Sequence, residues 1–191
     1  MSKESDRLPV QIDPFRLALA RREYDGNLSL THFKRLGQSL TDNDGLVQVS
    51  LAFGTETVGV DLSYVHGLIK ADLMIQCQRC LEPMKFPVDM EFSIAFVHTD
   101  NEAEAVPVPY EPFVVDELPI TLLDLIEDEI LLFLPGIARH ELDECPAKHW
   151  IAEDGEDHEL INDTLNNGGH SGKSENPFSV LAQLKTPDKG K

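Results

Sequence analysis

The chain has 191 residues and a formal net charge of −18, because 34 acidic side chains stand against 16 basic ones. This length allows one domain with a sizeable core and a tail, or two small domains at most. No apolar run reaches the roughly 18 residues that a membrane helix needs, and the N-terminus lacks the pattern of a secretory signal. We therefore expect a cytoplasmic protein with no membrane partner, whose 3 cysteines are reduced.

The negative charge is concentrated in the later part of the chain. Residues 1–40 hold 7 basic and 5 acidic side chains, whereas residues 101–150 hold 2 and 12. An acidic surface repels nucleic-acid phosphates and attracts basic partners, so DNA is not an expected ligand and any RNA contact requires a local basic patch. The candidates for an RNA-binding patch flank two predicted N-terminal helices: Arg16, Arg21, Arg22, Lys34 and Arg35. An ordinary solvated surface is the competing interpretation, since the arginines of the first helix do not share one face.

The first forty residues predict short elements. Residues 8–14 alternate like a strand, and residues 14–23 predict a short helix with a proline in its first turn. Residues 24–30 predict a strand or an extended link around a glycine. Residues 29–40 predict a second helix, because three of their apolar side chains are spaced for one helical stripe.

Long alternating patterns follow and predict a β-rich core. Residues 46–54 alternate between apolar and polar side chains, and residues 55–58 predict the turn of a hairpin. Residues 58–76 alternate over nearly their whole length, with Gly67 at an expected bend or bulge.

The segment CQRCLEP, residues 77–83, separates two of these long strands. Residues 84–99 alternate again and place six apolar side chains on one face. The cysteine-bearing segment is therefore predicted to be the tip of an antiparallel hairpin. Residues 100–117 are acidic and contain prolines, which predicts a loop.

Residues 119–135 predict the main helix, which an apolar stripe orients and Pro135 ends. The run Glu127–Asp128–Glu129 lies in this helix. Neighbouring helical residues point about 100° apart, so these carboxylates cannot converge on one substrate. We interpret them as a solvated face, although an apolar residue within the charged side indicates a second contact surface on this helix.

The composition changes after residue 149. We predict one α+β domain over residues 1–150, with an antiparallel β-rich core, flanking N-terminal helices and one main amphipathic helix. Residues 151–175 predict an acidic disordered linker, and residues 176–191 a capped amphipathic helix. That tail either packs on its own domain or docks into a partner's groove. The side chains expected to make the contact are Phe178, Leu181 and Leu184.

Three interpretations apply to the cysteines. Two thiolates at C-x-x-C spacing on a hairpin tip suit zinc, and the later segment RHELDEC supplies two further ligands. The candidate ligands of a structural zinc are Cys77, Cys80, His140 and Cys145. A redox centre would need the pair at a helix N-terminus, and a plain structural turn remains the third interpretation. We find no convincing active site and expect no enzymatic activity.

Several segments, in this order, resemble the YceD family of proteobacteria, the large ribosomal RNA subunit accumulation proteins. They are IDPFRLALARREYDG, CQRCLEPM, YEPFVVDE, LLDLIEDEILLFLP, the H-x4-C pair and ENPFSVLAQLK. The resemblance implies a cytoplasmic, non-enzymatic role in the synthesis, processing or stability of 23S ribosomal RNA. Many relatives carry extra cysteines after the position of His140, whereas this chain keeps only Cys145 there.

Three mechanisms remain open for such a role. The protein could bind a large-subunit ribosomal RNA precursor through its N-terminal basic residues. It could instead act as an acidic adaptor or chaperone that binds a basic ribosomal protein. Its tail helix could also recruit another assembly factor. A thiol-based enzyme is the alternative from another class, and a catalytic cysteine would react rapidly at neutral pH.

Overall fold

The computed structural model describes residues 8–58 and 60–148. The chain divides into two units, Met1–Pro146 and Ala147–Lys191. The helices and strands of the first unit follow one another as β1 (Gln11–Ile12), α1 (Pro14–Leu19), β2 (Glu23–Ser29), the 3-10 helices η1 (Leu30–His32) and η2 (Leu36–Gln38), β3 (Leu40–Asp42), β4 (Leu46–Val58), β5 (Val60–Gln76), β6 (Pro83–Val97), α2 (Asp100–Glu104), β7 (Glu111–Val114), β8 (Ile120–Thr121) and α3 (Leu122–Phe133). None of the described helices is long and apolar enough to cross a bilayer.

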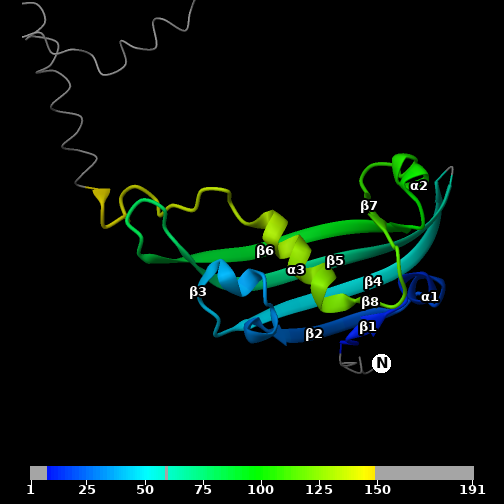
Figure 1. Cartoon of the computed structure of the whole chain (residues 1–191), viewed down its shortest axis with the longest axis horizontal. Helices are drawn as coiled ribbons and strands as arrows, with labels where there is room; N and C mark the ends of the chain where they lie inside the picture. The colour runs from blue at the N-terminus through cyan, green and yellow to red at the C-terminus, as the bar shows by residue number, and fades with distance from the viewer. Residues whose placement is uncertain (1–7, 59, 149–191) are drawn as a thin grey trace, which may run out of the picture. The chain divides into compact units, whose positions relative to one another are not determined.

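A six-stranded sheet forms the body of this unit (Figure 1). Its main path runs β2-β4-β5-β6-β7, with β3 also paired to β5. All its pairings are antiparallel except that of β6 with β7. Strands β5 and β6 stay in one continuous register from Ser63↔Phe96 to Gln76↔Pro83. The fold is therefore α+β with long antiparallel hairpins, as the alternating patterns predict.

Only one face of the sheet is covered by helices in the described part of the chain; we call it the inner face. Helix α3 lies across it (Figure 1), and Ile126 and Ile130 are buried in the core with the inward side chains of β5 and β6. Helix α1 contacts the same face through Phe15, whose ring packs edge-on against Phe96 at 6.5 Å. Because side chains alternate along a strand, the other set points to the opposite side, the outer face.

The sequence predicted most of these elements. The long strands and the hairpin tip at residues 77–83 are confirmed. The helices predicted over residues 14–23 and 119–135 are present but shorter, as α1 (Pro14–Leu19) and α3 (Leu122–Phe133). The turn expected at residues 55–58 is wrong, because β4 continues to Val58 and pairs with β5 throughout. The loop expected at residues 100–117 instead contains α2 and β7.

The helix predicted over residues 29–40 is also wrong. Two 3-10 helices and β3 occupy this segment. Phe33 is in an extended conformation with φ −85° and ψ 110°, so it separates the two 3-10 turns. The three apolar side chains that matched a helical stripe still face the core, since Phe33 and Leu36 are buried and Leu40 packs against the cluster. The helical spacing of these apolar residues thus predicted correctly that they face the core, although no continuous helix forms.

The predicted linker at residues 151–175 and the tail helix with Phe178, Leu181 and Leu184 lie outside the described residues. They stay predictions.

Gly67 lies in a regular part of the sheet rather than at a bend or bulge, since it pairs in register with both Leu51 and Phe92. A Cβ atom at this position would lie 2.0 Å from Cζ of Phe92. The glycine therefore makes room on the inner face for a phenylalanine ring from the next strand.

Substituting Gly67→Ala should lower the free energy of unfolding by about 1–3 kcal/mol, the usual effect of overpacking a core. Chemical denaturation with urea measures this difference. Gly136→Ala is the matched control, because a Cβ atom there meets nothing within 4 Å. Adding Phe92→Leu to Gly67→Ala should restore part of the loss, and no restoration would show that the ring is not the cause.

Candidate metal centre

The hairpin between β5 and β6 forms a tight knuckle. The Cys77 N–H donates to the Glu82 carbonyl at 3.0 Å, and the Leu81 N–H donates to the Cys77 carbonyl at 2.9 Å. Leu81 takes a left-handed conformation with φ 64°. The chain therefore turns back over its own cysteines, and Cys77 and Cys80 lie in the same turn.

The segment after α3 approaches this knuckle from the other side. Helix α3 ends at Phe133, before Pro135. The Gln78 N–H donates to the Ala138 carbonyl at 2.8 Å, which ties the two segments together through their backbones. A second small turn follows, in which the Cys145 N–H donates to the Glu141 carbonyl at 3.0 Å. These bonds bring His140 and Cys145 to the knuckle.

All four predicted ligands converge. One ligand atom from each of Cys77, Cys80, His140 and Cys145 lies within 4.8 Å of the others. The Cys80 Sγ and His140 Nδ1 atoms are 3.4 Å apart. Cys77 and Cys145 are buried, and Cys80 is partly buried. The cluster is thus a compact Cys3His group that joins two loops distant in sequence, the β5–β6 hairpin tip and the segment after α3.

The backbone around the knuckle favours a thiolate. Burial by itself would raise the pKa of Cys77, but the N–H groups of Cys80, His140 and Arg79 and the Cys80 thiol lower it to about 5. The pKa of Cys80 is raised, mainly by burial and also by the neighbouring sulfurs of Cys77 and Cys145. Negative charges on adjacent sulfurs repel one another, so the three thiols cannot all ionise without a counter-charge. A bound cation would supply that charge and stabilise the thiolates.

The donor set fits zinc. Three sulfurs and one imidazole nitrogen are ligands that structural zinc uses, and tetrahedral Zn–S bonds of about 2.3 Å place sulfurs about 3.8 Å apart. The observed limit of 4.8 Å needs only a small contraction to reach that spacing. Four protein ligands leave no coordination position open for a substrate, so the group could hold a metal for structure rather than for hydrolysis.

The carboxylate run of α3 is not a solvated face, which corrects the interpretation from sequence. Glu127 and Glu129 are 3% and 8% exposed, and only the side chain of Asp128 is well exposed. Glu127 Oε1 accepts from the N–H groups of Arg35 at 2.7 Å and Leu36 at 2.9 Å. Its Oε2 accepts from the Arg35 guanidinium at 3.0 Å. The second contact surface on this helix is therefore with η2.

Glu129 is buried against other acids. Burial, followed by the charges of Glu111 and Asp128, raises the pKa of Glu129 to about 7. An ordinary carboxyl in the unfolded chain ionises at a pKa of about 4.3. Between these values the folded protein holds a proton that the unfolded chain releases, so Glu129 makes stability fall as pH rises through this window.

Glu129→Gln should therefore raise the free energy of unfolding at pH 8 by about 1–2 kcal/mol and change it little at pH 5. The amide has the shape of the protonated acid but cannot ionise. Urea denaturation at the two pH values measures the difference. Glu117→Gln, at an exposed position, is the control for the substitution itself. Equal effects of Glu129→Gln at both pH values would contradict the assignment.

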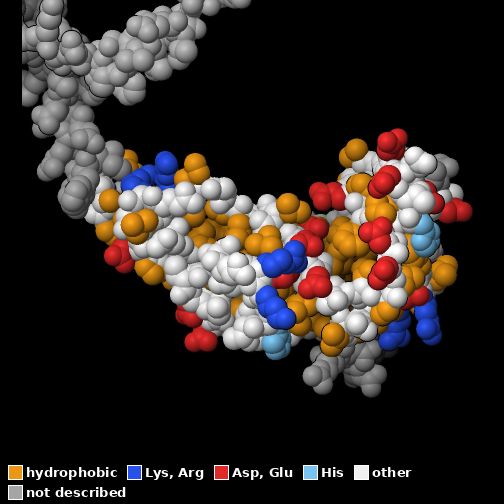
Figure 2. Space-filling view, viewed as in Figure 1, with side chains coloured by type: hydrophobic (Ala, Val, Ile, Leu, Met, Phe, Trp, Pro, Cys, Tyr) orange, Lys and Arg blue, Asp and Glu red, His pale blue; other side chains and the backbone are white. Residues whose placement is uncertain are grey.

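The five candidate RNA-binding residues do not form one cluster along the fold. Arg16, Arg21 and Arg22 lie in α1 or just after it, and Lys34 and Arg35 lie between η1 and η2. All are exposed, and the blue side chains in Figure 2 form several separate groups rather than one patch. The Arg35 guanidinium is bound to Glu127 and Asp128. An RNA contact by Arg35 would have to compete with this acidic pair.

Sequence reasoning missed a group of aromatic side chains on the outer face. Tyr64 and His66 are two residues apart on β5, and Tyr110 joins them from the segment predicted as a loop. The spacing of Tyr64 and His66 was a signal that both point to one face. No local signal placed Tyr110 beside them, because the contact depends on how the chain returns to pair β7 with β6.

The described residues form a β-rich α+β domain with a Cys3His cluster, in a chain of net charge −18. The family model described as large ribosomal RNA subunit accumulation protein YceD matches residues 65–185. A curated protein of the same name from Haemophilus influenzae is 31% identical over 180 residues, which cover 94% of this chain and 97% of the relative. No solved structure matches. The chain belongs to the YceD family.

Proposed function

We propose that the protein is a cytoplasmic factor in the biogenesis of the large ribosomal subunit, needed for the accumulation of 23S ribosomal RNA. The observation that carries this proposal is the similarity to a large ribosomal RNA subunit accumulation protein over almost the full length of both chains. It acts by binding rather than by catalysis. The burial of Cys77 and Cys145 supports this, because a nucleophilic thiol must be reached by its substrate.

The Cys3His group in this proposal holds a structural zinc through Cys77, Cys80, His140 and Cys145. The metal fixes the end of the β5–β6 hairpin to the segment after α3. It performs no chemistry on RNA. It keeps the surfaces of the domain in place for a partner.

Depletion of the protein in its own host tests the role. We expect the ratio of large to small ribosomal subunits, measured on sucrose gradients, to fall, together with the ratio of 23S to 16S ribosomal RNA. Expression of the intact chain should restore both ratios. Unchanged ratios after confirmed depletion would overturn the proposal.

A second candidate is that the protein acts as an adaptor for a basic ribosomal protein. The net charge of −18 favours it over direct RNA binding, since phosphates would be repelled over most of the surface. A direct RNA contact in this proposal would use the N-terminal basic residues Arg16, Arg21, Arg22, Lys34 and Arg35, of which Arg35 also pairs with Glu127. Binding to large-subunit RNA across a salt series separates the two, because phosphate contacts weaken steeply as salt rises.

A further inference from the structure

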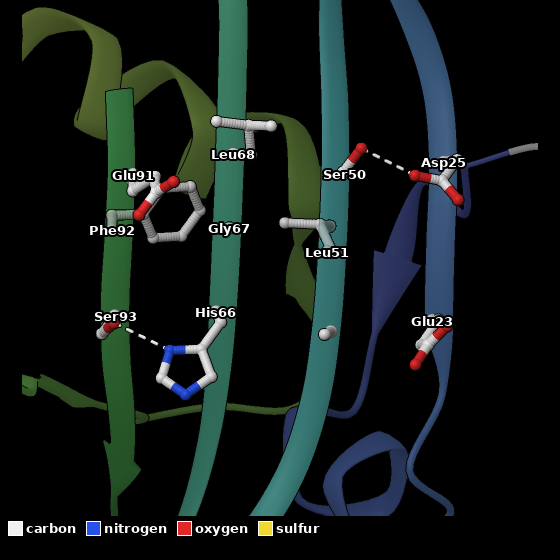
Figure 3. A pocket seen from close by; sticks show the side chains of 11 residues that line it. Glu23, Asp25, Ser50, Leu51, His66, Gly67, Leu68, Glu91, Phe92 and Ser93 are labelled. Atoms are coloured by element: carbon white, nitrogen blue, oxygen red, sulfur yellow. Dashed lines mark hydrogen bonds between the residues drawn. The ribbon is translucent and has the colours of Figure 1, made fainter. Parts of the chain in front are cut away.

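The outer face of the sheet carries a hollow of about 430 Å³ that crosses β2, β4, β5 and β6 (Figure 3). Strand registers place its side chains in two rows. One row runs Glu23–Ala52–His66–Ser93 and the next runs Asp25–Ser50–Leu68–Glu91. The two side chains from β4, Ala52 and Ser50, are small. Acidic side chains stand at the two edges of the hollow, Glu23 and Asp25 on β2 and Glu91 on β6.

The charges of this hollow are one-sided. Its lining contains Glu23, Asp25 and Glu91 and, among the described residues, no lysine or arginine. Further along the same face, Lys70 and Lys85 are each paired with an aspartate, at 3.1 Å and 2.9 Å. These two lysines of the outer face are each paired with an acid, and the charged side chains that line the hollow are all acidic.

Aromatic rings extend the hollow toward β7. The ring of Tyr64 lies 4.7 Å from that of His66 and 5.5 Å from that of Tyr110. A Cβ atom at Gly54 would lie 2.5 Å from the Tyr64 hydroxyl, so the glycine lets this ring lie close to the sheet. The Tyr110 hydroxyl donates to a carboxylate oxygen of Glu56 at 2.7 Å. A further negative charge therefore stands beside the rings.

Carboxylates next to a group of aromatic rings are suited to arginine. A guanidinium can donate two parallel hydrogen bonds to a carboxylate and stack on an aromatic face at the same time. RNA is disfavoured here, because every charged side chain in the hollow would repel its phosphates. The charge and the rings thus select one class of occupant.

We infer that the outer face of the sheet, at the hollow between Glu23 and Glu91 and the rings of Tyr64, His66 and Tyr110, is the docking surface for an arginine-rich segment of a basic protein. The inference rests on the proposed function for the identity of that protein as a component of the large subunit. The surface itself follows from the geometry.

Fluorescence anisotropy of a labelled oligo-arginine peptide with the full chain tests the surface. Glu23→Gln combined with Glu91→Gln should weaken binding about fivefold, the effect expected from the loss of two ion pairs. Asp116→Asn combined with Glu117→Gln is the matched control, because it changes the net charge equally at exposed positions outside the hollow. Equal weakening by both pairs would show general attraction to an acidic protein and would overturn the inference.

A second pair of variants keeps the charge constant. Ala52→Leu fills the floor of the hollow and should also weaken the peptide, whereas Gln48→Leu, on the same face of β4, should not. In amide NMR spectra the oligo-arginine should shift signals of β4 and β5 around the hollow. Shifts confined to other parts of the chain, or shifts of these signals by a single-stranded oligonucleotide RNA instead, would overturn the inference.

The two proposals fail separately. Normal subunit ratios after depletion would overturn the role in subunit biogenesis and leave the peptide result standing. Equal peptide binding by the site and control variants, with reduced large subunits after depletion, would remove the docking surface and keep the role.

Discussion

Cys145→Ser should remove bound zinc from the purified protein and lower its free energy of unfolding by about 2–5 kcal/mol, since metal binding that requires the folded state contributes directly to its stability. Cys145 is 1% exposed and supplies the ligand furthest along the chain. Without it, the segment after α3 loses its cross-link to the β5–β6 hairpin, and the loop between Cys80 and His140 is no longer closed by the metal.

Elemental analysis for zinc per chain and thermal denaturation with and without a chelator measure this effect. The intact protein should contain one zinc and lose thermal stability when it is chelated. His66→Ala is the control, because this histidine lies on the outer face and should leave the zinc content unchanged. An intact protein without zinc, whose melting temperature is unaffected by chelator, would refute the metal centre and leave the Cys3His group as packing alone.

Glu127→Ala should destabilise the protein by about 2–4 kcal/mol, because it leaves polar groups that were bound to a buried carboxylate without a partner. The side chain of Glu127 is 4% exposed and receives two backbone N–H groups and a guanidinium. Burial alone would raise the pKa of Glu127, but the Leu36 N–H and the contacts with Arg35 outweigh it and lower the pKa below its usual value.

The neighbouring acid provides the comparison. Asp128 also pairs with Arg35, but its side chain is 45% exposed, so Asp128→Asn should cost less than about 1 kcal/mol. Urea denaturation measures the free energy of unfolding of the two variants. The comparison shows how much more the buried carboxylate of Glu127 contributes than the exposed ion pair of Asp128. Equal losses for both would mean that the carboxylate of Glu127 is no more important than an exposed one.

The contact between Glu127 and η2 shows why the helix expected over residues 29–40 does not form. Two N–H groups that a continuous helix would pair internally are bound instead by a carboxylate of α3. The sequence distance is 91 residues for Leu36, which no local pattern can reveal. The spacing of apolar residues in this segment still predicted which side chains are buried. A continuous helix and the observed 3-10 turns both point the same side chains to the core.

The candidate metal ligands were predictable to different degrees. The pair in the knuckle is visible from its spacing alone, because two cysteines three positions apart lie in one turn between alternating strands. The side chains of His140 and Cys145 suit zinc, but their H-x4-C spacing is a loose pattern. They approach the knuckle because the Gln78 N–H donates a hydrogen bond to the Ala138 carbonyl. This contact depends on the tertiary fold and not on a local sequence pattern.

Alternating and helical periods in the sequence by themselves determined the long strands, the main helix and the class of fold, because they record which side chains must avoid water. The residue counts likewise determined that the chain is strongly acidic, with a formal net charge of −18. Only the tertiary structure decided that Glu127 and Glu129 are buried, that the ring of Phe92 occupies the space above Gly67, and that Tyr110 joins Tyr64 and His66. These contacts join residues far apart in the chain, so their energies depend on positions that no local pattern encodes.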